Sequence, residues 1–76
     1  MIYLFAKNQQ QAIYYLNKNN LDRVKTRIVT RPDLLRGLDK GTLLLLCGEW
    51  QDNPQKNEVL DIAIRDRLTI VKEVTL

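Results

Sequence analysis

The sequence predicts one small α/β domain with a mainly parallel four-stranded sheet, of the flavodoxin-like or Rossmann-like type. Three observations carry this prediction: two short, continuous apolar runs, two strand-like segments that mix apolar and charged residues, and two amphipathic segments between strand-like ones. Such alternation favours parallel strands joined by right-handed crossovers. With 76 residues, the chain is expected to form a single domain over residues 1–76.

The first strand and helix are predicted near the amino terminus. Residues 2–6 are all apolar and are followed by polar residues, which is typical of a strand buried on both faces. Asn8 is placed to cap the helix that follows, and this helix is expected to end at Asn19 and Asn20. One side of the predicted helix carries its apolar residues, which are Ala12, Ile13, Leu16 and Tyr15.

Residues 23–30 predict a second strand, at an edge of the sheet, because they alternate in character and are rich in β-branched residues. One face of this strand would carry Val24, Thr26 and Ile28. The other face would carry Arg23, Lys25 and Arg27. A single helical turn is predicted over residues 33–36, where Gly37 stops it.

The rest of the chain repeats the pattern of strand, helix and strand. Residues 43–47 are an apolar run bounded by glycines, which suits a buried strand, and residues 50–55 predict a loop. A helix is predicted over residues 57–66, with an apolar stripe of Val59, Leu60, Ala63 and Ile64. Residues 69–76 predict the last strand. The two all-apolar strands should be central, which gives the strand order 2-1-3-4.

Ligands of open parallel sheets bind beyond the carboxyl ends of the strands, where the strand order reverses. In the predicted order, this crevice lies between the first and third strands. The candidate ligand-binding residues at its rim are Lys7, Asn8, Arg31, Glu49 and Trp50. Lys7 and Arg31 can hold an anion, with Trp50 as a stacking platform. A second interpretation, in which these are solvated loop residues and Trp50 covers an edge of the core, is favoured because indole rings usually pack.

The sequence contains no complete set of catalytic or cofactor-binding residues. No glycine-rich phosphate loop follows the first strand, which argues against nucleotide hydrolysis and hydride transfer. Cys47 is the single cysteine and the chain has no histidine, so the usual zinc sites are excluded and Cys47 is expected to fill core space. General base catalysis by Glu49 with Asp52 is a minor alternative. A non-enzyme without cofactor or metal is therefore favoured.

Basic and aromatic side chains outside the crevice are candidates for contact with a partner. The row of Arg23, Lys25 and Arg27 can contact phosphates or protect an edge strand from aggregation, and the second role is favoured because no aromatic residues are interleaved. Candidate interface residues are Tyr14, Tyr15, Lys72 and Val74. Adjacent helical positions lie about 100° apart, so one of the two tyrosines should pack inward and the other point outward.

Several short motifs in the second half of the chain carry a resemblance to a known group. They are Arg36-Gly37-Leu38, Gly41-Thr42 with the leucine run, Gly48, Trp50 and Asn53-Pro54. In these motifs the chain resembles small bacteriophage-encoded Rossmann-like α/β proteins of unknown function. The resemblance implies a compact α/β fold and a phage origin, and it supplies no activity.

The leading expectation is a small non-enzymatic phage accessory protein that binds a host or phage protein, as a homodimer or another small homo-oligomer. The alternative is a module that binds nucleotide or nucleic acid in the strand-end crevice. The net charge of +3 is mildly basic and compatible with either. Residues 1–6 are apolar but short and lack a basic leader, so neither a signal peptide nor a membrane span is expected, and a cytoplasmic location, in the host cell for a phage protein, is predicted.

Overall fold

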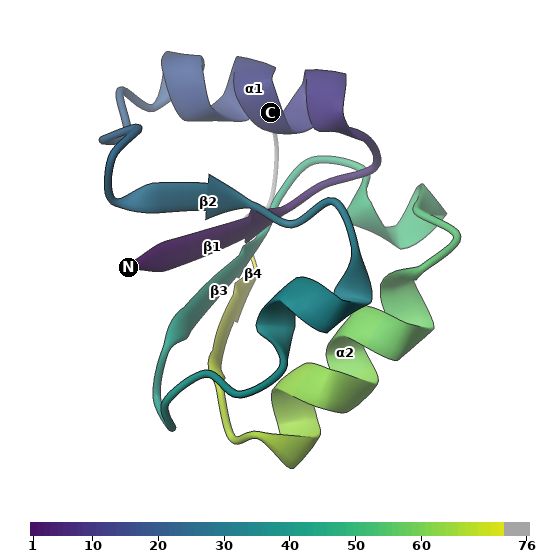
Figure 1. Ribbon diagram of the computed structural model, residues 1–76. Helices are drawn as coiled ribbons and strands as arrows, with labels where there is room; N and C mark the ends of the chain where they lie inside the picture. The colour runs from purple at the N-terminus through teal and green to yellow at the C-terminus, as the bar shows by residue number, and fades with distance from the viewer. Residues whose placement is uncertain (73–76) are drawn as a thin grey trace.

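The computed structural model describes residues 1–72, and Figure 1 shows how their helices and strands are arranged. Residues 73–76, and with them the interface candidate Val74, lie outside this description. In chain order the elements are β1 (Ile2–Phe5), α1 (Gln9–Lys18), β2 (Thr26–Ile28), the 3₁₀ turn η1 (Pro32–Leu35), β3 (Leu43–Leu46), the 3₁₀ turn η2 (Trp50–Asp52), α2 (Lys56–Arg65) and β4 (Thr69–Lys72).

The four strands form one sheet in the order β2-β1-β3-β4, and every neighbouring pair is parallel. The two apolar strands β1 and β3 are central, with Ile2 opposite Leu43 and Phe5 opposite Leu46. The α/β fold and the strand order predicted from the sequence are therefore confirmed. Because the strands are parallel, the carboxyl ends of β1 and β3 lie side by side.

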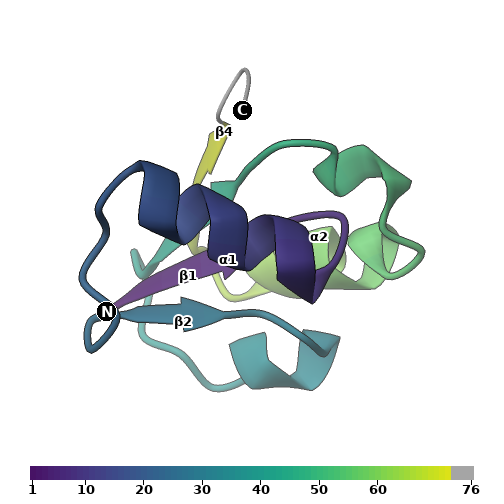
Figure 2. The same ribbon diagram turned by 90° about the horizontal axis from the view of Figure 1, so that it is seen from above.

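Helical elements cover both faces of the sheet. Figures 1 and 2 show α1 on one face and α2 on the other, and η1 packs beside α2. Along β1, Leu4 is buried towards α1, whereas Tyr3 and Phe5 are buried towards α2. This alternation follows from the pleat of a strand that is covered on both sides.

The start of α1 and the end of η1 follow the local signals in the sequence. The side-chain oxygen of Asn8 accepts a hydrogen bond of 2.8 Å from the backbone N–H of Gln11, which confirms Asn8 as the N-cap. The turn η1 ends at Leu35, and Gly37 has a φ of 77°, a conformation that glycine adopts without strain.

The strand at the β2 edge is shorter than predicted. Residues 23–25 form a turn because Asp22 accepts hydrogen bonds from the N–H of Val24, through its side chain, and from the N–H of Lys25, through its carbonyl. The prediction that Val24 lies on the inner face of the strand is wrong, since this side chain is 84% exposed. An aspartate side chain that bonds its own main chain two residues later competes with the strand ladder, and here the turn prevails.

Two helical positions also differ from the predicted stripes. Ile13 of α1 is 41% exposed and Ile64 of α2 is 68% exposed, whereas Ile62 of α2 is buried. The buried positions of α2 are Val59, Ile62 and Ala63, a spacing of three and four residues that the sheet selects from two overlapping apolar stripes. The predicted loop after β3 contains the 3₁₀ turn η2.

Candidate functional site

Lys7 and Asn8 follow β1, and Glu49 and Trp50 follow β3, so these residues lie at the sheet edge where the sequence predicts a crevice. The polar side chain that lies between the two strand ends is that of Gln11 in α1. The side-chain oxygen of Gln11 accepts hydrogen bonds from the backbone N–H of Lys7 (3.2 Å) and of Glu49 (3.1 Å), and its nitrogen donates to the Glu49 carboxylate (3.3 Å). Two backbone amides that would attract an anion at this position are thus bonded to the chain's own carboxamide.

Asn53 closes the same region from the other side. Its side-chain nitrogen donates to the carbonyl of Ala6 (2.9 Å), and its side-chain oxygen accepts from the backbone N–H of Gln55 (2.8 Å). The ends of β1 and β3 are therefore joined by two amide side chains, Gln11 and Asn53. Neither residue was among the predicted ligand-binding residues, although Gln11 and Asn53 each follow a predicted strand end by five or six positions.

Trp50 packs inside the protein. Its side chain is 8% exposed and belongs to the core on the α2 face, and the ammonium nitrogen of Lys72 lies 5.8 Å from the centroid of its ring. An indole between the core and a lysine offers no open face for a base to stack on. The packing interpretation describes Trp50 correctly.

The remaining predicted ligand residues do not converge on one point. Asn8 uses its side-chain oxygen to cap α1. Arg31 is exposed and forms an ion pair with Asp33, with 3.6 Å between Nε and Oδ1. Cys47 is completely buried, with its sulfur 3.6 Å from the carbonyl oxygen of Phe5, so the prediction of a core thiol is confirmed.

A second candidate site lies between α1 and the edge strand β2. It is a groove with a volume of about 300 Å³, at the lower end of the range of small-ligand pockets. Most of the surface that lines it is apolar. The residues that line it are Ile13, Leu16, Arg23, Thr26, Arg27 and Ile28. The exposure of Ile13, which the helix pattern did not predict, is explained by its place in the wall of this groove.

Thr26, one of the residues that line this groove, carries a buried polar atom. The residue is 8% exposed, and its hydroxyl oxygen is buried without a hydrogen-bond partner among residues 1–72. Leaving a buried hydroxyl unpaired costs about 1–3 kcal/mol of stability.

The outer edge of β2 presents backbone groups to a partner. Towards β1, the carbonyl of Lys25 accepts from the N–H of Ile2 (2.8 Å) and the N–H of Val29 donates to the carbonyl of Leu4 (2.8 Å). In a parallel ladder the direction of the backbone groups alternates, so the N–H and C=O groups of Thr26 and Ile28 face away from β1. An edge strand whose backbone N–H and C=O groups face outward is a template for pairing with another chain.

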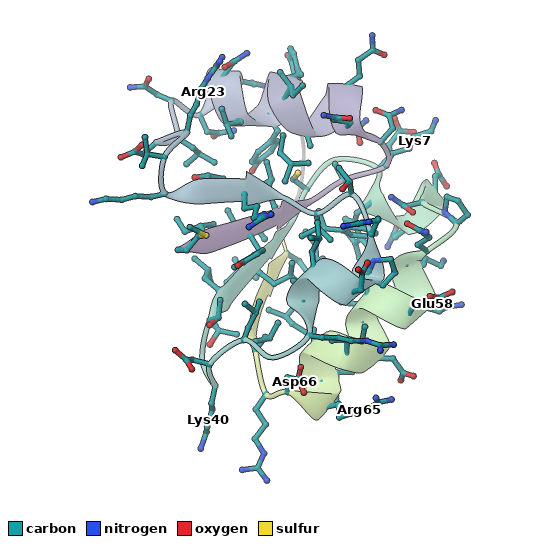
Figure 3. All side chains as sticks on the ribbon, in the orientation of Figure 1. Lys7, Arg23, Lys40, Glu58, Arg65 and Asp66 are labelled. Atoms are coloured by element: carbon teal, nitrogen blue, oxygen red, sulfur yellow. The ribbon has the colours of Figure 1, made fainter. Side chains whose placement is uncertain are left out.

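Positive charge is concentrated around β2. Residues 17–36 contain six basic and two acidic side chains, a local net charge of +4, whereas the whole chain carries +3. Arg23, Lys25 and Arg27 are exposed, and none of them forms an ion pair within the described part of the chain. Arg23 donates a hydrogen bond to the side-chain oxygen of Asn17. In Figure 3, Arg23 and Lys7 lie at opposite ends of α1, so the groove and the strand-end crevice are separate sites.

The interface candidates have different surroundings. Tyr14 is 53% exposed, and the ammonium nitrogen of Lys18 lies 5.8 Å from its ring centroid. Tyr15 is 4% exposed and belongs to the core under α1, so it presents almost no surface to a partner. Lys72 covers Trp50 at the other edge of the sheet. The prediction that one tyrosine packs and the other points outward is confirmed.

Comparisons with known proteins found no family model, no curated protein and no solved structure that matches this chain. Among residues 1–72, no helix is both long enough and apolar enough to cross a membrane. The described residues also contain no cluster of three or more acidic, cysteine or histidine side chains suited to a metal ion.

Proposed function

We propose that this chain is a small non-enzymatic accessory protein, in keeping with the phage origin that the resemblance implies, and that it binds an extended segment of another protein at the open edge of β2. The observation that carries the proposal is the outward-facing backbone of Thr26 and Ile28 directly beside an apolar groove. Addition of a peptide strand to an exposed sheet edge is a recurrent mode of recognition, in which backbone hydrogen bonds supply affinity and pockets for alternate side chains supply specificity.

The dimensions of the edge define the segment that fits it. β2 has three residues, so the partner adds a short strand and makes few backbone hydrogen bonds. The groove receives a side chain from that strand on the α1 face of the sheet. Binding therefore depends on the backbone pairing and on this side chain together.

The strand-end crevice has less support as a binding site. Gln11 is bonded to the amides that an anion would use, and Trp50 is packed in the core. The edge of β2, in contrast, combines outward-facing backbone groups, a hydroxyl without a hydrogen bond and cations without an ion pair, as far as residues 1–72 are concerned.

A selection from a library of short random peptides tests the proposal and does not require that the partner be identified. The decisive variant is Ile28→Pro, because the N–H of Ile28 faces outward and proline at this position removes the donor to a partner without removing a bond to β1. Ile28→Val is the matched control, since it keeps both the N–H and the β-branched shape.

We expect enriched peptides to bind the unmodified protein and Ile28→Val, and to lose binding to Ile28→Pro. Circular dichroism of both variants verifies that the fold is retained. Enriched peptides that bind Ile28→Pro as tightly as the unmodified protein, or the absence of any enriched peptide, would overturn the proposal.

A further inference from the structure

We infer that the segment bound at the β2 edge carries a threonine, an acidic residue and an aliphatic residue in succession, placed opposite Thr26, Arg27 and Ile28. This inference rests on the proposed function and specifies the chemistry of its partner. It follows from the face of the sheet on which each of the three β2 side chains lies.

The pleat of β2 separates these side chains. Ile28 packs against the core cluster under α1, and Thr26, two positions away, shares that face. Arg27 lies between them, so the pleat directs its side chain to the α2 face, where its register partner Tyr3 is also found, and the residue borders the groove as well. A strand added outside β2 continues the same pleat, so its side chains alternate between the apolar groove and the arginine.

The two positions on the groove side require different residues. Next to Ile28, the groove walls of Ile13 and Leu16 favour an aliphatic side chain. Next to Thr26, a second threonine supplies the hydrogen bond that the buried hydroxyl lacks, and threonine pairs across strands are a known stabilising combination. A purely apolar side chain there would leave the hydroxyl unpaired.

The position on the other face favours an acidic residue. Arg27 is exposed and has no ion-pair partner among residues 1–72, and Arg23 and Lys25 add to the positive potential. Opposite charges directly across two strands attract, and like charges repel. Glu58 of α2 and Asp66, the C-cap of that helix, lie away from Arg23 in Figure 3, and the two acidic residues within 17–36 leave a local net charge of +4.

An acidic peptide explains the site better than a nucleic acid does. Single-stranded nucleic acids bind by stacking their bases on exposed aromatic rings along a basic groove. The residues that line this groove include no aromatic side chain, and the one tryptophan of the chain is buried. A strand with aliphatic and acidic residues uses both the apolar walls and the cations.

The test uses two labelled synthetic peptides whose binding is measured by fluorescence anisotropy. The acidic probe contains Thr-Glu-Val-Glu-Thr and the matched basic probe contains Thr-Lys-Val-Lys-Thr. Each places threonine, charge and valine in the required order in both chain directions. Arg27→Glu is the decisive protein variant. Lys40→Glu, which changes the net charge equally at a site far from Arg23 in Figure 3, is the control.

We expect the acidic probe to bind about tenfold more tightly than the basic probe, and Arg27→Glu to reverse this preference. Lys40→Glu should change the affinity for the acidic probe by less than about twofold at physiological salt, where distant exposed charges are screened. Thr26→Val should weaken binding of the acidic probe and leave the charge preference intact.

Three other outcomes would overturn the inference, and each leads to a different conclusion about the β2 edge. If both probes bind equally and both are lost in Ile28→Pro, the acidic specificity is wrong while strand addition stands. If neither probe binds, the proposed motif is wrong, and the peptide selection alone then decides on the proposed function. If a single-stranded oligonucleotide binds instead, with dependence on Arg27, the edge is a nucleic-acid site.

Discussion

The side chain of Gln11 and the residue Glu49 are joined by hydrogen bonds in both directions, although they lie 38 positions apart in the sequence. Through the further bond from the N–H of Lys7, one carboxamide connects the first turn of α1 with the ends of both central strands. At the point where the strand order reverses, the side-chain oxygen of Gln11 thus accepts the backbone N–H bonds that a bound anion would otherwise accept.

Replacing Gln11 by leucine should lower the free energy of unfolding by about 1–3 kcal/mol, because two backbone N–H groups lose their acceptor. Leucine keeps the size and helix propensity of the residue, so the loss reports on the hydrogen bonds. Urea denaturation followed by circular dichroism measures the change.

Gln10→Leu is the matched control for Gln11→Leu, since Gln10 is exposed in the same helical turn and makes no hydrogen bond through its side chain among the described residues. Its effect should lie within about 0.5 kcal/mol. Equal effects of the two substitutions would show that the bonds of Gln11 contribute nothing to stability.

Thr26→Val should stabilise the protein in the absence of a partner, by about 1 kcal/mol, because valine fills nearly the same space and removes a buried hydroxyl that has no hydrogen bond to any of residues 1–72. Thermal unfolding measures the shift. Thr30→Val, at an exposed position, serves as the control. A lower stability of Thr26→Val would mean that the hydroxyl has a partner in solution.

Asn53→Asp should lower the free energy of unfolding by about 1–3 kcal/mol, because the carbonyl of Ala6 loses its donor and instead faces a carboxylate. The bond from the N–H of Gln55 survives, since a carboxylate still accepts it. Asn57→Asp, at an exposed position in the first turn of α2, should be neutral or slightly stabilising by interaction with the helix dipole. Urea titrations that show no difference between the two variants would contradict this account.

The fluorescence of Trp50 should not respond to ATP or to single-stranded oligonucleotides titrated at low salt, because the ring is packed in the core and covered by Lys72. Trp50 is the only tryptophan, so the signal has one source. A saturable change in emission would revive the strand-end crevice as a nucleotide site, and Gln11→Leu would show whether Gln11 restricts access to it.

Most of the fold could be predicted from local patterns in the sequence. Continuous apolar runs at residues 2–6 and 43–47 have the composition of doubly covered strands, and this composition alone places them at the centre. The pattern was insufficient where two signals compete. Val24 continues an alternating strand pattern, but the side chain of Asp22 forms a turn there, and Ile64 lies on one of two overlapping stripes between which only the sheet discriminates.

The sites were less predictable because they depend on contacts across the fold. Lys7 and Glu49 follow the two central strands as predicted. Gln11 stands three residues after the N-cap Asn8, where a glutamine side chain can fold back on the start of the helix, but this local signal does not indicate the bond to Glu49 after β3. The groove was not predicted as a site at all. It lies where side chains of α1, Ile13 and Leu16, meet those of β2, so its presence depends on how α1 packs over β2.

The basic side chains of the two edge strands, β2 and β4, also affect how copies of the molecule can associate. In an all-parallel sheet, the β2 edge of one copy can dock on the β4 edge of the next, and a head-to-tail contact that does not close into a ring grows into a fibre. Growth of this kind brings Arg27 and its basic neighbours towards Lys72, and repulsion between like charges opposes it. Neutralising these side chains would remove an electrostatic barrier to polymerisation. The charges that favour an acidic partner therefore also oppose self-association of the sheet edges.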